Sequence, residues 1–497
     1  MIRTLKVILW GEEIGRLSWD DNRKNSYFTY NPDFVRKDID ISPLWASIQN
    51  NRGLMPIWGE EERIYQKLPA FLADSLPDAW GNQLFELWRQ QNHLSNREIS
   101  PLDKLSFIGK RGMGALEFIP EYERNKKSEK IDVKSLVDLA DRIFTEREKA
   151  QILPEESLTM QSLLAVGTSA GGRQPKAIIA INPQNGEIRS GQISDLEGYE
   201  YYLLKFGNAA YNSAELEMTF YELAIKTGIN MMHSELLTVD GNRHFMTKRF
   251  DRVGGRKLHT QTLAAMYPEA NSYEELISVC RKLHLPEVDC IEVYRRLIFN
   301  VLANNTDDHN KNFSFVMDER GNWRLSPAYD ITYILNMGGF QPSEDHCMFI
   351  RAKLRNITKE DVLQFASDNG IRKPESIIRE VKDSLLQFRN VALKNEVDEK
   401  WVGRVESTIL SHLKDWGEYE TSCSQVVEIN GHQVSNVRME QAYKGNYHLY
   451  ANIDGNERKF IIGKNKEEFA IIEKYGMVNL SEVQLMDMVK KYLCKGE

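Results

Sequence analysis

Cysteine is scarce in this sequence, and the few cysteines present form no recognisable site. The chain has five, an odd number, at scattered positions: Cys280, Cys290, Cys347, Cys423 and Cys494. No two of them form a CxxC pair, so their spacing indicates neither a zinc site nor a disulfide framework. A reducing compartment, the cytoplasm, fits such a chain.

Long apolar runs and an excess of positive charge are also missing. No stretch approaches the roughly 20 apolar residues that a membrane-spanning helix needs. The first residues lack the apolar core of a signal peptide. The formal net charge is -8, whereas non-specific nucleic-acid binders are usually basic. We therefore expect no membrane association, and contact with DNA only through a partner protein.

A chain of 497 residues is too long for one ordinary core, and its pattern predicts four units. Residues 1–125 are expected to form an α+β subdomain, with strands near 5–10 and 26–30 and a helical region near 61–88. Residues 121–132 are mostly charged and indicate an exposed connector. The predicted units are 1–125, the strand-rich residues 133–253, the helical residues 254–415, and a small α+β appendage, 416–497, with several strands and a helix from about Ser481.

Within residues 133–253 the pattern alternates between strands and one helix. Residues 177–181 and 200–206 read as strands, and Lys205 lies near the end of the second. Asn212 is predicted to cap a helix, with Glu215 completing a capping-box pattern. Two further strands are expected on either side of the Asp-Gly turn at 240–241.

The strongest chemical signal is the polar segment 305–313, NTDDHNKNF. It follows an apolar helix and precedes a short predicted hairpin. Asp307 and Asn312 are five positions apart, as are the base and the metal-binding Asn of a protein-kinase catalytic loop. Lys311 could neutralise a transferred phosphoryl group, and Asp330, beyond the hairpin, suits a second Mg²⁺ ligand.

Simpler interpretations of this segment stay open. Asp and Asn are common in turns, so the segment alone could be an ordinary polar turn. The helix before it, the hairpin after it and Asp330 argue against that interpretation. An EF-hand fits poorly, because the segment lacks a central Gly and a closing Glu.

A second signal is the small-residue segment 166–176, VGTSAGGRQPK. Gly171 and Gly172 would let backbone N–H groups approach phosphates, and Arg173 and Lys176 add positive charge. The segment is neither a Walker A loop nor a GxGxxG loop. Taken alone, a glycine-rich surface turn is the more common explanation.

Two lysines at strand ends complete the candidate set. Lys205 suits the strand lysine that contacts nucleotide phosphates, with Glu217 in the next helix as its carboxylate partner. A surface lysine with an extended side chain is the simpler alternative. Lys248 and Phe250 end the last predicted strand, where a hinge would contact adenine, although Phe250 could equally belong to the core.

Taken together, residues 1–415 resemble the HipA family of toxin kinases. Residues 75–81 look like its LPDxWG segment, and residues 109–116 are similar to its GRxxGAL segment. Its GGxxPK loop resembles residues 171–176, and its hinge resembles residues 248–251. Its DxHxKNFS loop is similar to residues 307–314, and its AYD segment to residues 328–330. The last ~80 residues exceed the usual family length and match nothing in this resemblance.

The resemblance implies a two-lobed protein-kinase-like fold behind an N-terminal subdomain, and an enzyme that uses ATP and Mg²⁺. It implies Asp307 as the catalytic base and Asn312 and Asp330 as Mg²⁺ ligands. It implies that Lys205, Lys248, Phe250 and His309 contact the nucleotide, and that Ser169, beside Thr168, is autophosphorylated to switch the enzyme off. Members pair with a small helix-turn-helix antitoxin, and some phosphorylate an aminoacyl-tRNA synthetase.

Three functions compete at this stage. The leading hypothesis is an active serine/threonine protein kinase toxin. The second is a nucleotide-binding transcriptional co-regulator without kinase activity, against which the set Lys205, Asp307, Asn312 and Asp330 argues. The third keeps the fold but transfers phosphate to a lipid or small molecule, and no basic amphipathic helix supports the lipid version.

Overall fold

The computed structural model describes most of the chain. The described residues are 2–50, 55–56, 62–121, 131–146, 159, 162–164, 174–191, 196–334 and 344–417, together with four later strands between 427 and 462. The chain divides into two compact units, Met1–His412 and Leu413–Glu497.

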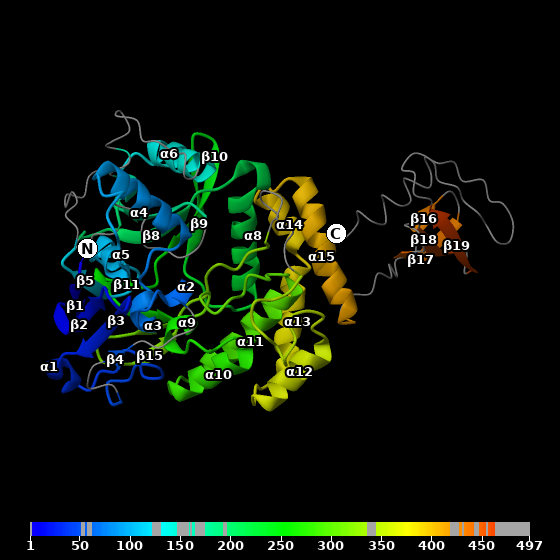
Figure 1. The fold of residues 1–497 in the computed structure, drawn as a ribbon. Coiled ribbons are helices and arrows are strands. Elements are labelled where there is room, and N and C mark those ends of the chain that lie inside the picture. The colour runs from blue at the N-terminus through cyan, green and yellow to red at the C-terminus, as the bar shows by residue number, and fades with distance from the viewer. Residues whose placement is uncertain are drawn as a thin grey trace. The chain divides into compact units, whose positions relative to one another are not determined.

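The first unit begins with a five-stranded antiparallel sheet in the order β4-β3-β2-β1-β5 (Figure 1). Its strands are β1 (Thr4–Leu9), β2 (Glu12–Asp20), β3 (Asn25–Tyr30), β4 (Met55–Pro56) and β5 (Leu116–Ile119). The helices that accompany it are α1 (Pro32–Val35), α2 (Glu62–Tyr65), α3 (Ala70–Ala73), α4 (Ala79–Gln91) and α5 (Pro101–Ile108). Alternate residues of β1 and β3 face a core that includes Leu5, Phe28 and Phe71, which gives these strands their period of two.

The helical region expected near residues 61–88 is three separate helices. Pro69 precedes α3 at the N-cap position, and Pro77 lies just before Asp78, the N-cap of α4. Proline lacks a backbone N–H and constrains the residue before it, so each proline favours a new helix start over a continuous helix.

A second antiparallel sheet has the order β7-β6-β8-β10-β9. Its strands are β6 (Lys176–Ile181), β7 (Ile188–Ser190), β8 (Glu200–Lys205), β9 (Ser234–Val239) and β10 (Asn242–Lys248). Helix α6 (Val133–Glu146), the 3₁₀ turn Ala209–Tyr211 and helix α8 (Ser213–Lys226) belong to the same region. Trp80 and Leu84 of α4 share a buried core with Ile179 and Leu204 of this sheet, so the N-terminal subdomain and the sheet pack as one body.

The expected cap of α8 is wrong in its detail. Asn212 does stand at the N-cap, but its φ of +48° places it in the left-handed region and its side chain accepts no bond from the first helical turn. Its Oδ1 accepts instead from the backbone N–H of Asp398, at 3.1 Å. A long-range partner has replaced the local one that the sequence pattern predicts.

The helical unit expected from residue 254 does not begin with a helix, because short strands come first. The short strands β11 (Arg252–Val253) and β12 (Arg256–Lys257) pair, and β13 (His259–Thr262) joins the predicted hairpin of β14 (Ser314–Met317) and β15 (Trp323–Leu325). The sequence of β13, HTQT, has no apolar alternation, which is why its pattern did not predict a strand.

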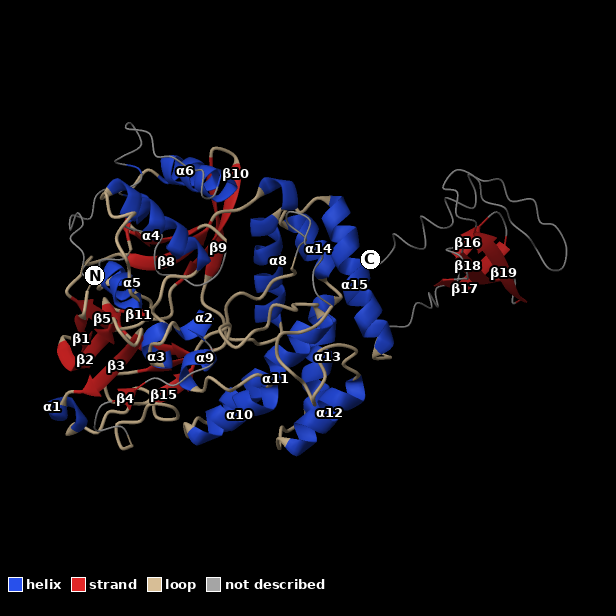
Figure 2. Cartoon of the chain, viewed as in Figure 1, coloured by secondary structure: helices blue, strands red, loops and turns tan. Residues whose placement is uncertain are grey.

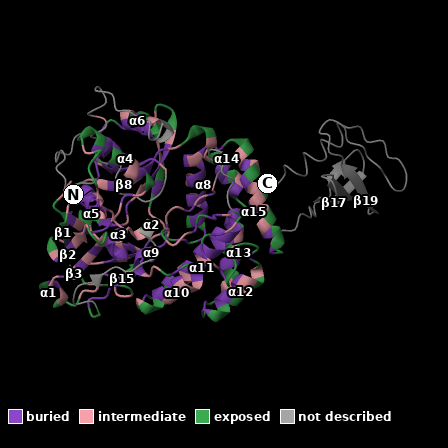
Figure 3. Ribbon diagram, in the orientation of Figure 1, coloured by how far each residue is buried: buried purple, intermediate pink, exposed green. Residues whose placement is uncertain are grey.

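Helices make up the rest of the first unit (Figure 2). They are α9 (Leu263–Met266), α10 (Tyr273–Lys282), α11 (Glu287–Leu302), α12 (Lys359–Asp368), α13 (Pro374–Leu385), α14 (Phe388–Lys394) and α15 (Glu399–Asp415), which crosses the boundary between the units. Helix α8 packs against α13 and α14. Figure 3 shows α8 and α11 buried along much of their length. Among the described residues, no helix combines the length and apolar character needed to cross a membrane.

The second unit contains a four-stranded antiparallel sheet in the order β16-β17-β18-β19. The strands are Val427–Ile429, His432–Gln441, Tyr447–Ile453 and Asn456–Ile462. The helix expected from about Ser481 lies outside the described residues.

Candidate functional site

Lys205 is the centre of a buried cluster of charges. It is the last residue of β8, and its Nζ donates to a carboxylate oxygen of Glu217, on α8, and to Oδ1 of Asp330. The side chains of Lys205 and Glu217 are both nearly excluded from solvent. The structure therefore brings together three predicted residues from a strand, a helix and a segment 125 positions further along the chain.

Each member of this cluster depends on the others for its charge. Burial alone would lower the pKa of Lys205, but Asp330 and Glu217 raise it above its ordinary value. Burial raises the pKa of Glu217, and Lys205 opposes that shift. Burial would also raise the pKa of Asp330, but Lys205 and Lys176 hold it below its ordinary value. The Asp330 carboxylate is thus ionised in the folded protein.

Lys176 lies beside Lys205 in the sheet. The two residues stand directly opposite each other in the antiparallel pair β6–β8. The Nζ of Lys176 is 3.5 Å from Oδ2 of Asp78, in the turn before α4. Asp78 was not among the residues predicted to form the site, because only the fold brings residue 78 to residue 176.

The segment predicted as a catalytic loop begins where α11 ends. Asn304 there has a φ of +56°, which turns the chain out of the helix. The side chain of Asp307 is 54% exposed, and Nε2 of His309 is 3.9 Å from its Oδ1. Asn312 Nδ2 donates to the backbone O of Asp307, at 2.7 Å. This bond holds the two proposed functional residues of the loop together, and Lys311 between them is exposed.

Asp308 points the opposite way and is fully buried. Its Oδ2 accepts from the hydroxyl of Tyr273, at 2.8 Å, and from Nδ1 of His346, at 2.9 Å. Its Oδ1 accepts from the backbone N–H of Cys347, at 2.8 Å. Tyr273 also accepts from Asn300, on α11. Sequence reasoning missed this role, since the only local sign of it is an Asp beside the predicted base.

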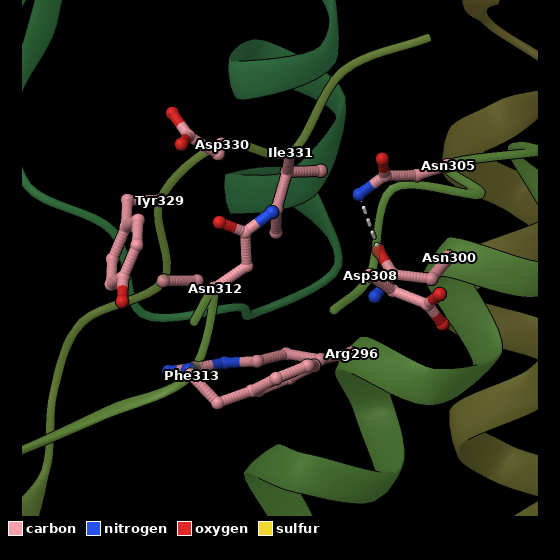
Figure 4. A pocket seen from close by; sticks show the side chains of 10 residues that line it. Arg296, Asn300, Asn305, Asp308, Asn312, Phe313, Tyr329, Asp330 and Ile331 are labelled. Atoms are coloured by element: carbon pink, nitrogen blue, oxygen red, sulfur yellow. Dashed lines mark hydrogen bonds between the residues drawn. The ribbon is translucent and has the colours of Figure 1, made fainter. Parts of the chain in front are cut away.

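Asn312 and Asp330 line one small pocket from two segments of the chain (Figure 4). The side-chain nitrogen of Asn312 donates the hydrogen bond to the loop backbone. This bond does not involve the side-chain oxygen of Asn312, which is the atom that can bind a cation. Asp330 is ionised and has a φ of +54°, a conformation that non-glycine residues adopt mostly where the surroundings impose it. An amide oxygen and a carboxylate suit Mg²⁺, which takes its other ligands from phosphates and water. No group of three or more His, Cys, Asp or Glu able to hold a metal occurs in the described part of the chain.

Two aromatic rings lie near this pocket. Phe250 stacks on Tyr329, with ring centroids 5.8 Å apart and an angle of 25° between the planes. Tyr329 lines the pocket, and its hydroxyl donates to the backbone O of Lys311, at 2.8 Å. Phe250 is thus linked to the predicted catalytic loop through Tyr329. Lys248 is ion-paired with Glu200 on the neighbouring strand β8, and no contact joins it to the cluster around Lys205 among the described residues.

The residues after Lys248 fasten the strand end to the N-terminal subdomain. Asp251 is completely buried and accepts from Arg249, at 2.8 and 2.6 Å, from Arg252, at 2.7 Å, and from the backbone N–H of Gly114, at 2.7 Å. Burial would raise the pKa of Asp251, but the two guanidinium groups depress it strongly. Gly114 belongs to the predicted 109–116 segment, so two of the motifs read from the sequence meet here.

The glycine-rich segment is described only at its end. Ser169, Thr168, Gly171, Gly172 and Arg173 lie outside the described residues. Gln174 Nε2 donates to the backbone O of Phe206, at 2.9 Å, and the N–H of Phe206 donates to Pro175, at 3.0 Å.

Comparison with known proteins places this chain in a family. Residues 5–119 match the model of the HipA N-terminal domain, and residues 168–389 match the model of the HipA-like C-terminal domain. The protein named "Putative kinase Y4mE" from Sinorhizobium fredii is 22% identical over 342 residues, which are 64% of this chain and 78% of that protein. "Putative kinase Y4dM" from the same organism is 25% identical over 194 residues, 37% of this chain and 44% of that protein.

A solved structure shows the same fold. HipA of Shewanella oneidensis MR-1, in a complex with HipB and its operator DNA, superposes with a TM-score of 0.59 and 18% identity over 84% of this chain and 98% of that one. The likeness confirms the predicted α+β, kinase-like fold. With both domain models matched in order, the chain belongs to the HipA family.

Proposed function

We propose that this protein is an ATP- and Mg²⁺-dependent serine/threonine protein kinase and the toxin of a toxin–antitoxin pair. The observation that carries the proposal is the contact of Lys205 with both Glu217 and Asp330. A strand lysine held by a helix carboxylate, beside a metal-binding aspartate, is the arrangement that protein kinases use for phosphoryl transfer. Family membership and the kinase names of the relatives support it.

Asp307 is proposed to accept the proton of the attacking hydroxyl. Its carboxylate is exposed and can reach a protein substrate, while the bond from Asn312 fixes the loop backbone behind it. The hydroxyl oxygen forms the new bond to the γ-phosphorus, the bond to the ADP oxygen breaks, and the hydroxyl proton passes to Asp307.

Lys205 is proposed to contact the α- and β-phosphates, and Glu217 to keep it in place. Phosphates would substitute for part of the negative charge that Asp330 now presents to Lys205. Asn312 and Asp330 would hold Mg²⁺, which when bound shields the charge of the phosphates. Lys311 is proposed to neutralise the transferred phosphoryl group. Lys248, Phe250 and His309 stay predicted nucleotide contacts.

Two substitutions test these roles. Asp307→Ala should abolish transfer of ³²P from labelled ATP to protein and leave Mg-ATP binding intact, because its role is confined to proton transfer. Asp330→Ala should abolish transfer and also weaken Mg²⁺-dependent binding. The exposed Asp383 provides a matched control, and Asp383→Ala should react like the wild type. Wild-type turnover in a folded Asp307→Ala or Asp330→Ala variant would contradict the proposal, and so would label found only in lipid.

The regulatory part of the proposal concerns the glycine-rich segment. Autophosphorylation at Ser169 would add nearly two negative charges, which would repel the ATP phosphates. Gly171, Gly172 and Lys176 are the proposed phosphate contacts that this modification would disrupt. Mass spectrometry of protein incubated with Mg-ATP should find phosphate on Ser169 as activity falls. Phosphate on Thr168 instead, with the same loss of activity, would contradict this assignment.

The proposed protein partner follows by analogy with the family. The S. oneidensis HipA structure contains HipB and operator DNA, and by analogy this chain would bind a small helix-turn-helix antitoxin and reach DNA through it. A protein substrate, such as an aminoacyl-tRNA synthetase, is part of the same proposal. If a neighbouring gene encodes a small helix-turn-helix protein, its co-expression with this chain should yield a stable complex and relieve growth arrest. Growth arrest that no neighbouring gene relieves would contradict the pairing.

A further inference from the structure

The proposed function leaves unexplained the segment at residues 75–81, which the sequence singles out. Asp78 caps helix α4, with its Oδ1 accepting from the N–H of Gly81 at 2.6 Å. Its other oxygen lies 3.5 Å from Nζ of Lys176. Two residues on, the indole N–H of Trp80 donates to the backbone O of Lys176, at 3.1 Å. One turn of the N-terminal subdomain therefore contacts both the side chain and the backbone of Lys176.

Lys176 occupies an unusual position in the second sheet. It opens β6 directly after the glycine-rich segment, and it stands opposite Lys205 in the strand pair. Paired residues of antiparallel strands project to the same face, where like charges repel. Both lysines are buried, Lys176 to 2% exposure and Lys205 to 7%. Two buried ammonium groups side by side are stable only where anions surround them.

The surrounding anions come from three parts of the fold. Glu217 and Asp330 pair with Lys205, whereas Asp78 is the carboxylate that faces Lys176 from the N-terminal subdomain. Burial lowers the pKa of Lys176, and Asp78 and Asp330 oppose that shift. Burial raises the pKa of Asp78, and Lys176 opposes that shift. The two side chains therefore form a buried ion pair, which holds Lys176 in place.

We infer that Asp78 is a positioning residue for the nucleotide site, which holds Lys176 beside Lys205 for the phosphates of a nucleoside triphosphate. The N-terminal subdomain is thereby part of the binding site, although none of its residues needs to touch the ligand. This inference rests on the proposed kinase function.

Asp78→Asn is the informative substitution, because it separates charge from structure. Asparagine caps helices about as well as aspartate, so α4 keeps its start while the charge facing Lys176 is lost. Titration calorimetry with Mg²⁺ and the non-hydrolysable analogue adenylyl imidodiphosphate should show binding about tenfold weaker than the wild type. Asp78→Ser, which also caps, serves if the Asn variant does not fold.

A matched control lies in the same subdomain. Asp103 is buried, lies in the first turn of helix α5 and accepts from the backbone N–H of Ser100, at 2.8 Å. Asp103→Asn should affect thermal stability in the way that Asp78→Asn does, and leave nucleotide affinity unchanged. A loss of affinity in both variants would show a general effect on the fold and overturn the inference.

A double-mutant cycle separates positioning from a merely structural role. Lys176→Met should weaken analogue binding by itself, and Asp78→Asn should then weaken it no further, since its effect passes through Lys176. An equal loss in the presence and absence of Lys176 would overturn the inference. So would wild-type or tighter binding by Asp78→Asn, the latter showing that Asp78 competes with phosphate. If the wild type binds no Mg-nucleotide, the proposed function fails and the inference fails with it.

Discussion

At the scale of single residues, Asp307 and Asp308 show how adjacent aspartates take opposite roles. The side chain of Asp307, the proposed base, is half exposed, which would let it meet a protein substrate. Asp308 is buried among Tyr273, His346 and the backbone N–H of Cys347. Because a carboxylate only accepts hydrogen bonds, Nδ1 of His346 carries the proton in this contact. Asp308 therefore ties the proposed catalytic loop to helix α10 and to the segment around residue 346.

This anchoring predicts a cost when Asp308 is removed. Asp308→Ala leaves three donors without an acceptor inside the protein, and should lower the free energy of unfolding by about 3 kcal/mol. The loop would also lose the hydrogen bonds of Asp308, which fix the backbone beside Asp307. The turnover rate should therefore fall, while affinity for Mg-ATP changes little. Thermal unfolding and steady-state kinetics check both effects. The exposed Glu319 supplies a control, and similar losses in Glu319→Ala would contradict the assignment.

At the scale of elements, the sequence predicts local features well and long-range partners poorly. The strand ending at Lys205 and the hairpin after the proposed catalytic loop follow from alternation and turn residues nearby. Asp78 and Asp308 could not be found in this way, because their partners lie 98 and up to 39 positions distant. Asn212 failed as a side-chain cap for the same reason, since Asp398 competes for its Oδ1.

At the same scale, Gly114 of the 109–116 segment meets Asp251, just after the end of strand β10. Gly114 has a φ of +74°, and a Cβ there would meet Thr260, whose backbone N would be 3.0 Å away. Gly114→Ala should therefore destabilise the protein by about 2 kcal/mol or more, and displace the N–H that Asp251 accepts. Gly186 has a nearly equal φ of +71° with open space around it, so Gly186→Ala should cost only about 1 kcal/mol. Equal shifts in chemical denaturation of the two variants would contradict this account of Gly114.

At the scale of the whole molecule, a buried histidine makes stability depend on pH. His259 is the first residue of β13, which pairs with β14, and its Nε2 is 3.2 Å from the backbone O of Ile41 in the N-terminal subdomain. Burial lowers its pKa to about 4, although the contact with Ile41 opposes the shift. The unfolded chain binds this proton near pH 6.5. The contribution of neutral His259 is therefore complete above about pH 6.5 and is lost as the pH falls towards 4.

Chemical denaturation at several pH values measures that loss. Between pH 6.5 and 5, wild-type unfolding free energy should fall by about 2 kcal/mol more than that of His259→Gln, which does not titrate. The exposed His93 is the control, and His93→Gln should follow the wild-type curve. Parallel curves for the wild type and His259→Gln would contradict a depressed pKa.

The division of the chain gives the last prediction. Met1–His412 and Leu413–Glu497 are separate compact units, and every proposed site residue lies in the first of them. A chain that ends at Trp416 keeps that unit and all of α15. Because a unit with its own core can fold alone, the shortened chain should stay soluble and bind Mg-ATP with wild-type affinity. Calorimetric titration of the purified shortened and full-length chains provides the comparison. Aggregation together with lost nucleotide binding would show that residues 417–497 belong to the kinase core.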